Sequence, residues 1–415
     1  MSSAPIEAET TPYRWIILFG VWLLYFSFGV IAASMAPLVR PVIVALDLDN
    51  ARMGVVLGAW PLVYVAAAIP CGAFLDKLGP RKALLFGVAI IAASGAARGL
   101  ATSEFKLILA VAIFGLGGPV ISIGAPKLVS LWFAERERGM AMGIYITGSN
   151  LGAVAALSLT NGVMMPLLGQ DWRLVLFCYA GFALAAGAVW FAISAHPASR
   201  AMERRLAKEP QRPQIEQFVS LMRLPVVRIV LVMSVGIFFF NHGLNNWLPE
   251  ILRTNGMAPA QAGYWASIPT GVGIVGALLI PRLAAEPRRL KILLALFMGA
   301  GVATLLLRAE AGPLLAAGLA LQGIARGAMM AVAVLVLMES SGVESGNVGL
   351  AGGMFFSAAE IGGVLGPLTI GFVAEATGGF STPLALLTVV AGALILLLFW
   401  LRMALRDTKM RAASP

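Results

Sequence analysis

Three charged side chains interrupt long apolar stretches of this chain. Arg326 and Glu360 lie about midway along two such stretches, and Lys127 lies near one end of a third. A charge at the centre of a membrane-spanning helix costs about 2.5 to 3.5 kcal/mol on insertion scales. Each of these side chains therefore needs a partner, a wet cavity or a function.

Arg326 carries a planar guanidinium group that can bind a carboxylate or another oxyanion through two hydrogen bonds. We therefore expect Arg326 to be a substrate ligand. An alternative arises because the stretches that hold Arg326 and Glu360 follow one another along the chain and form a hairpin. Arg326 could then simply neutralise Glu360 in a permanent ion pair.

Glu360 has a second interpretation besides this pairing. The proton occupancy of a carboxylate depends on burial and on nearby cations, so it could change if the contact with Arg326 breaks when the helices rearrange. Such a change would couple the rearrangement to the uptake or release of a proton. We expect Glu360 to be the proton-coupling residue, with permanent pairing as the alternative.

Four polar residues gather in the stretch 226–249. At 100° per residue they occupy one arc of about 140° on a helix, and this face must point away from lipid. They are Asn241, His242, Asn245 and Asn246. We expect the three asparagines to contact substrate. Histidine ordinarily changes its charge near neutral pH, so His242 could share the proton-coupling role or serve as a hydrogen-bonded structural group.

Lys127, Tyr25 and Arg98 complete the candidate residues. Lys127 is nine residues beyond Gly118, the repeat equivalent of Arg326, which is about 13 Å along a helix. Lys127 could attract anions at an inner vestibule of the substrate site, or its amine could snorkel to the interface. Tyr25 is the polar aromatic residue that the first apolar stretch offers to a substrate, and Arg98 is expected to be an interfacial anchor.

The elements that must position these residues are membrane-spanning helices. Hydrophobic residues make up 59% of the chain and charged residues 12%, against roughly half and a quarter in soluble domains. Stretches of about 20 apolar residues suffice to cross a bilayer, and twelve are present: 15–38, 53–75, 83–102, 107–133, 139–165, 173–194, 226–249, 260–281, 291–308, 313–338, 347–374 and 382–402. The pattern predicts an all-α membrane protein and excludes barrel strands, which alternate over about ten residues.

The net charge of +10 could suggest nucleic acid binding, but the basic residues concentrate in the loops of one side of the predicted spans. This distribution is explained by membrane topology, and the positive-inside rule then places both termini in the cytoplasm. We expect a multi-pass protein of the plasma membrane, and the short loops suggest a bacterial inner membrane. The first 13 residues lack a basic n-region, so we expect no signal peptide. Cys71 and Cys178 fall inside spans as small buried hydrophobes, which predicts neither a disulfide nor a metal site.

Weak internal repetition divides the chain into two halves of six spans. Residues 195–225 form the longest polar stretch and predict a cytoplasmic linker between an N-terminal bundle, 1–194, and a C-terminal bundle, 226–415. Gly115 and Gly323 are 208 residues apart, and the triplets that end in Gly152 and Gly362 are 210 residues apart. Small residues of this kind let helices approach closely in lipid.

The loop between the second and third spans carries the most specific motif. It runs Gly72-Ala-Phe-Leu-Asp76-Lys77-Leu-Gly79-Pro80-Arg81-Lys82 and resembles the signature of the major facilitator superfamily. That resemblance implies two pseudo-symmetric six-helix bundles around a central site, lined by spans 1, 4, 7 and 10, with alternating access. It also implies a cytoplasmic gating role for Gly72, Asp76, Gly79, Arg81 and Lys82, although a basic loop that only fixes topology is the alternative.

Shorter runs are similar to particular branches of that superfamily. Pro126-Lys127-Leu-Val-Ser-Leu-Trp132-Phe133 and Trp247-Leu-Pro249-Glu250 resemble bacterial cyanate- and nitrate-type anion transporters. The first run also resembles animal choline and haem carriers of the feline leukaemia virus receptor group.

We therefore expect a secondary active transporter of a small organic or inorganic anion that is coupled to protons. The alternative is a transporter or exporter of a polar organic cation or drug, with Glu360 binding the cation and Tyr25, Phe26 and Trp247 supplying ring faces. A non-transporting receptor is a third class. The chain has no phosphate-binding Gly-rich loop, metal cluster or nucleophile triad, so we expect neither an enzyme nor a cofactor. The expected partners are a small molecule, protons and lipid but no nucleic acid, and the expected state is a monomer.

Overall fold

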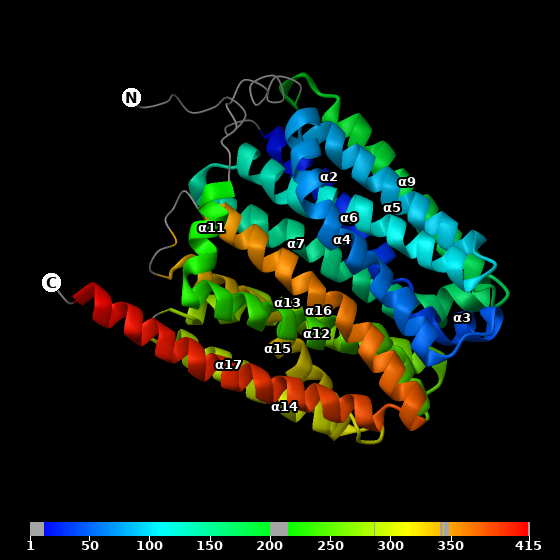
Figure 1. Cartoon of the computed structure of the whole chain (residues 1–415). Coiled ribbons are helices and arrows are strands. Elements are labelled where there is room, and N and C mark those ends of the chain that lie inside the picture. The colour runs from blue at the N-terminus through cyan, green and yellow to red at the C-terminus, as the bar shows by residue number, and fades with distance from the viewer. Residues whose placement is uncertain (1–11, 200–214, 286, 341–342, 344–347, 414–415) are drawn as a thin grey trace. The chain divides into compact units, whose positions relative to one another are not determined.

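The computed structural model describes residues 12–199, 215–285, 287–340, 343 and 348–413 (Figure 1). The elements in these ranges are helices, and no strand occurs among the described residues. Twelve segments are long and apolar enough to cross a membrane: Tyr13–Leu46, Asn50–Ala68, Pro80–Leu100, Glu104–Trp132, Arg136–Leu167, Trp172–Ser194, Pro225–Thr254, Pro259–Leu283, Arg289–Leu306, Pro313–Met338, Leu350–Thr377 and Ser381–Arg406. The predicted all-α chain with twelve spans is confirmed.

The chain separates into two compact units. Unit 1 comprises Met1–Leu48 and Ala59–Gln211, and unit 2 comprises Asp49–Gly58 and Arg212–Pro415. The start of one long helix therefore groups with unit 2 and its remainder with unit 1. Most of the predicted linker, 200–214, lies outside the described residues, so the boundaries 1–194, 195–225 and 226–415 stay a prediction.

Unit 1 is built from long helices that pack along one another. Its elements are α2 (Tyr13–Ala33), η1 (Ala36–Leu38), α3 (Val39–Leu46), α4 (Asn50–Leu78) from Ala59 onward, α5 (Pro80–Leu100), α6 (Glu104–Trp132), α7 (Glu135–Leu159), the π-helical turn η2 (Thr160–Met164), α8 (Met165–Leu167) and α9 (Trp172–Ser194). α2 packs on α7, and α5 packs on both α6 and α9. The core between these helices includes Ile91, Phe114, Trp132 and Trp190.

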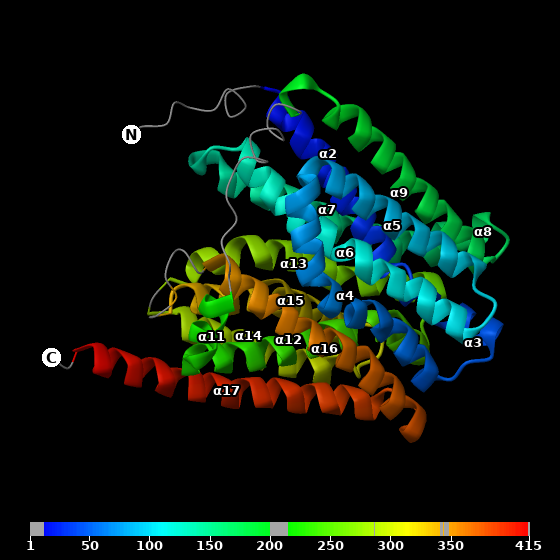
Figure 2. The same ribbon diagram turned by 45° about the horizontal axis from the view of Figure 1, so that its top comes forward.

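Unit 2 repeats this plan. Its elements are α11 (Ile215–Arg223), α12 (Pro225–Thr254), α13 (Pro259–Leu283), α14 (Arg289–Leu306), α15 (Pro313–Met338), α16 (Val348–Thr377) and α17 (Ser381–Ala413). α12 packs on α16, α13 packs on α15, and α17 runs along α14 and α12 (Figures 1 and 2).

Local sequence explains where several helices begin. Proline occupies the first turn of α5, α12, α13 and α15, where its missing N–H leaves no hydrogen bond unmade. Two other helices have side-chain caps. Ser103 accepts a hydrogen bond from the backbone N–H of Lys106 before α6 (3.4 Å), and Asp171 accepts one from that of Arg173 before α9 (2.8 Å).

Glycine brings one pair of helices in each unit into direct backbone contact. A Cβ on Gly152 of α7 would lie 2.1 Å from the carbonyl oxygen of Phe26 on α2. A Cβ on Gly362 of α16 would lie 1.9 Å from the carbonyl oxygen of Val235 on α12. The two glycines are 210 residues apart and their partners 209, so the two units make the same contact.

A second pair of glycines follows the same rule. A Cβ on Gly115 of α6 would lie 2.4 Å from the carbonyl oxygen of Trp60 on α4, and one on Gly323 of α15 would lie 2.5 Å from that of Pro269 on α13. These partners are again 209 residues apart. The repeat that is weak in the sequence thus corresponds to repeated helix contacts.

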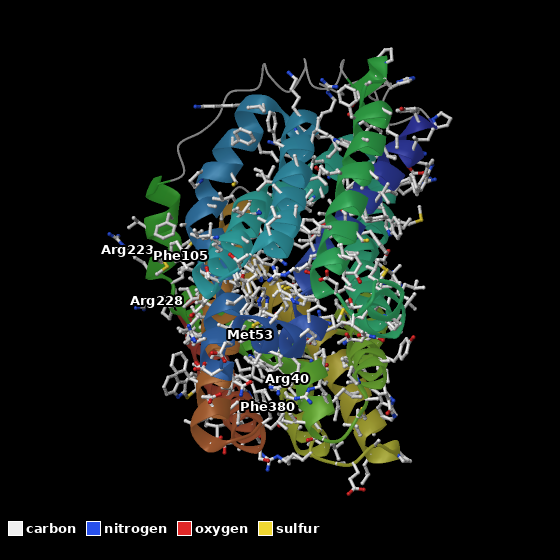
Figure 3. All side chains as sticks on the ribbon, turned by 90° about the vertical axis from the view of Figure 1, so that its right-hand side faces the viewer. Arg40, Met53, Phe105, Arg223, Arg228 and Phe380 are labelled. Carbon is white, nitrogen blue, oxygen red and sulfur yellow. The ribbon has the colours of Figure 1, made fainter. Side chains whose placement is uncertain are left out.

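α11 is a short helix that ends just before the spanning helix α12. Phe218, Val219 and Met222 are exposed apolar side chains on α11. Arg223 at its end and Arg228 in the first turn of α12 point outward from the ribbon (Figure 3). This combination of exposed apolar and basic side chains is typical of helices that lie along a membrane surface.

Candidate functional site

The structure of unit 2 brings together several of the polar residues predicted to bind substrate or protons. His242 comes from α12, Arg326 from α15 and Glu360 from α16. Arg326 donates a hydrogen bond from Nη1 to Oγ1 of Thr270 on α13 (2.7 Å). Arg326 also lies near enough to His242 for the two groups to interact electrostatically. Four helices therefore contribute to one polar cluster inside unit 2.

Arg326 and Glu360 do not form an ion pair. Among the described residues, the ion pairs shorter than 4.0 Å involve neither Arg326 nor Glu360, and the hydrogen-bond partner of Arg326 is the neutral hydroxyl of Thr270. Glu360 is 6% exposed, and its Oε2 has no hydrogen-bond partner among the described residues. The permanent pair that the sequence left open is therefore absent from this conformation.

Glu360 and His242 meet over Gly363, which is three residues after Glu360 on the same face of α16. A Cβ at Gly363 would lie 2.6 Å from Glu360 Oε2 and 3.2 Å from His242 Nδ1. Both atoms lie close to one point, so they are no more than 5.8 Å apart. Phe238 stacks on the imidazole ring of His242 at a centroid distance of 5.2 Å. The absent side chain of Gly363 thus makes room for a carboxylate and an imidazole to approach each other.

The three asparagines of α12 have different surroundings. Asn246 donates a hydrogen bond from Nδ2 to the carbonyl oxygen of His242 (2.8 Å), a local bond within the helix. Asn241 is 8% exposed, and its Oδ1 has no hydrogen-bond partner. Asn245 is half-buried. Asn241 is therefore the asparagine with a fully buried acceptor that has no hydrogen-bond partner among the described residues.

The structure adds residues that the sequence reasoning missed. Thr270 accepts a hydrogen bond from Arg326, and Gly363 leaves space for the side chains of Glu360 and His242. Gln322 is 0% exposed, and neither Nε2 nor Oε1 has a hydrogen-bond partner. The available signal for Gln322 was its position four residues before Arg326, which places both side chains on one face of α15.

Tyr25 and Lys127 belong to unit 1. The Tyr25 ring stacks on Phe28 (centroids 5.5 Å apart) and meets Tyr145 edge-on (5.1 Å). Phe28 in turn lies 5.1 Å from Phe114, so Tyr25 belongs to a continuous aromatic cluster. Lys127 is half-buried in α6. Their roles as substrate ligands stay predictions.

Part of the predicted gating loop is also visible in unit 1. Gly79 joins α4 to α5 with φ 78°, a backbone conformation that favours glycine, whereas a Cβ on Gly72 would meet nothing within 4 Å. Arg81 donates a hydrogen bond to the carbonyl oxygen of Ser194 at the end of α9 (3.3 Å). Lys82 is exposed, and the side chain of Asp76 lies outside the described residues, so the gating role stays a prediction.

Two further expectations about polar residues are wrong. Arg98 is not an interfacial anchor, because it is 1% exposed and donates hydrogen bonds to the Ile31 carbonyl oxygen (2.9 Å) and to Ser34 Oγ (3.1 Å). It binds the end of α2, where the carbonyl groups attract a cation. Cys178 is exposed rather than buried, while Cys71 is half-buried, and both are free thiols.

Comparison with known proteins agrees with the architecture. A family model described as Major Facilitator Superfamily matches residues 17–311. An uncharacterized transporter of Bacillus subtilis (strain 168) is 25% identical over 90% of this chain and 90% of its own length. A probable galactarate/D-glucarate transporter of Escherichia coli (strain K12) is 23% identical over 96% of this chain and 95% of its own. A D-galactonate transporter of Escherichia coli O6:H1 is 24% identical over 83% of this chain and 85% of its own.

A solved structure has the same fold. It is a bacterial homolog of the human lysosomal transporter Spinster in an inward-facing, unoccupied conformation, with a TM-score of 0.76. The match covers 96% of this chain and 98% of that chain at 16% sequence identity. At this identity the likeness defines the fold alone.

Proposed function

Because this chain belongs to the Major Facilitator Superfamily, we propose that it is a proton-coupled secondary transporter that moves a small anion across the membrane by alternating access. The chain is a multi-pass membrane protein, and its family and relatives are transporters rather than enzymes. We favour an organic anion with a carboxylate group, because two of the relatives above are named as transporters of galactarate/D-glucarate and of D-galactonate, which are carboxylates.

The observation that carries this proposal is the setting of Arg326. Its guanidinium group lies inside the span Pro313–Met338 and is held by the neutral hydroxyl of Thr270 rather than by a carboxylate of the described chain. A cation in a span is costly unless it is paired or functional. A substrate carboxylate would supply the missing partner through paired hydrogen bonds.

The proton-coupling part of the proposal depends on Glu360 and His242. A buried carboxylate beside an imidazole has two places for one proton, and the choice depends on what else the site holds. Binding of an anion at Arg326 changes the electrostatic field at both groups. In this scheme Glu360 carries the transported proton and His242 stabilises one protonation state.

The orientation and assembly state are part of the same proposal. Both termini lie in the cytoplasm, because basic residues concentrate in the loops of that side. The protein acts as a monomer, since one chain carries both units.

Transport assays in proteoliposomes test the proposal. Wild-type protein should exchange radiolabelled D-glucarate or D-galactonate in counterflow and accumulate it when a pH gradient is imposed. Arg326→Lys should lower kcat/KM at least about tenfold, because the amine cannot form the paired hydrogen bonds of a guanidinium group. The matched control is Arg282→Lys, an exposed position at the end of α13.

Glu360→Gln separates coupling from binding. This variant should exchange anions in counterflow but should not accumulate them in response to a pH gradient. Accumulation at the wild-type level would exclude Glu360 as the coupling residue. Flux of organic cations without flux of any carboxylate would instead favour the cation or drug transporter.

A further inference from the structure

Gln322 is an amide buried in the middle of the spanning helix α15. It is 0% exposed, and both Nε2 and Oε1 lack a hydrogen-bond partner. Burial of an amide without partners costs free energy, because its hydrogen bonds to water are lost and not replaced. A residue of this kind in a packed helix needs a reason, and apolar packing does not provide one.

The unpartnered polar atoms of unit 2 are not scattered. Among the residues that the structure describes, they lie on α12, α15 and α16, the helices that carry His242, Arg326 and Glu360. Asn241 Oδ1, the Gln322 amide and Glu360 Oε2 belong to this group. By contrast, Asn246 and Thr270 in the same region do have hydrogen-bond partners. The free atoms therefore lie on the same three helices as the ionisable residues of the polar cluster.

The geometry of α15 fixes where Gln322 lies relative to Arg326. Four residues correspond to about 6 Å along the helix axis and a rotation of about 40°. Neighbouring residues point elsewhere, since Leu321 contacts the position of Gly299 on α14, and Gly323 lies against Pro269 on α13. Gln322 and Arg326 thus share a face that is not used for these helix contacts.

We propose that Gln322 is a specificity-determining substrate ligand that recognises a hydroxyl group of the carboxylate held by Arg326, an inference that rests on the proposed function. An amide has one donor group and one acceptor group, and a hydroxyl is the small substrate group that uses both. Asn241 Oδ1 offers a further acceptor to the same class of substrate. The site then selects hydroxylated carboxylates over carboxylates that lack hydroxyl groups.

Such a site rejects the analogue that lacks the hydroxyl, because binding it leaves the buried amide without partners. D-glucarate and adipate provide the probe, since both have six carbons and two carboxylates and only D-glucarate carries hydroxyl groups. The measurement is uptake of radiolabelled D-glucarate into proteoliposomes with unlabelled D-glucarate or adipate as competitor. Wild-type protein should prefer D-glucarate at least about tenfold.

Gln322→Leu should abolish this preference, with weaker inhibition by D-glucarate and unchanged or stronger inhibition by adipate. Arg326→Lys should weaken both competitors alike. Leu321→Met is the matched control, because it changes the next residue on the side that faces α14, and it should keep the wild-type preference. An unchanged preference in Gln322→Leu with a reduced response in Arg326→Lys would overturn the role of Gln322 and leave the proposed function intact.

Thermal unfolding in detergent without substrate gives a readout that does not depend on the probe. If Gln322 has no partner in the protein, Gln322→Leu should unfold at the wild-type temperature or above it, because an unpaired polar group is replaced by an apolar one. A clear fall in its Tm would show that the amide has a structural role, and would overturn the inference. Transport of neither dicarboxylate by wild-type protein, together with no flux of any other carboxylate, would overturn the proposed function and the inference with it.

Discussion

Replacement of Gly362 by alanine tests the backbone contact between α12 and α16. The added methyl carbon would lie 1.9 Å from the Val235 carbonyl oxygen and 2.7 Å from the Phe239 nitrogen. Both are backbone atoms, so no side chain can turn away to relieve the clash. Ordinary contact begins near 3.4 Å, and the two helices must therefore separate locally by about 1.5 Å.

The free energy of unfolding should fall by about 2 kcal/mol. Overpacking of a tight core costs about 1–3 kcal/mol, and a forced backbone shift of this size belongs at the upper end. Alanine returns about 1 kcal/mol through its better helix propensity. For a unit of about 200 residues, 1 kcal/mol corresponds to about 2–4 °C in Tm, so the expected fall is about 4–8 °C.

The assay is thermal unfolding in detergent at a fixed heating rate, with Gly353→Ala as matched control. Gly353 is on the same helix, and a Cβ there would meet nothing within 4 Å, so its Tm should stay equal or rise by about 2–4 °C. Gly152→Ala should behave like Gly362→Ala, because it makes the equivalent clash in unit 1. A Tm of Gly362→Ala at or above that of wild-type protein would refute the reasoning.

Three further substitutions address the coupling site, the gating loop and a buried hydrogen bond. Gly363→Ala should displace the Glu360 carboxylate and lower pH-driven accumulation at least about tenfold with little change in Tm; wild-type accumulation would show that the position of this carboxylate is not critical. Asp76→Asn should abolish or strongly slow transport at normal expression, and uptake at the wild-type rate would remove the gating role. Trp247→Phe removes the bond from Nε1 to the Pro367 carbonyl oxygen (2.9 Å) and should cost about 1–3 kcal/mol of unfolding free energy; an unchanged Tm in the same thermal assay would show that the bond contributes no stability.

The sequence predicted the fold because the hydrophobic pattern of a membrane protein is strong. Each helix must hide its own backbone polar groups from lipid, so length and apolarity suffice to locate the twelve spans. The glycine repeat added the internal duplication, since Gly115, Gly152, Gly323 and Gly362 sit at equivalent helix contacts.

The polar cluster of unit 2 was predictable only in part. Arg326, His242 and Glu360 stood out because their burial in lipid is costly. Gln322 and Gly363 did not, because an uncharged or small residue inside a span resembles ordinary packing until its neighbours are known. The error at Arg98 has the same origin: a position near the end of a span does not reveal that another helix ends beside it.

The glycine contacts have a consequence for movement within each unit. Between α2 and α7, and between α12 and α16, backbone atoms are in direct contact at the glycines, so no side chains lie between the helices there that could repack. The two helices of each pair therefore move together as a rigid body. A conformational change inside a unit must then occur at helix interfaces that are packed with side chains. The interface between α14 and α17 is one of these, and there the hydroxyl groups of Thr304 and Thr388 are hydrogen-bonded.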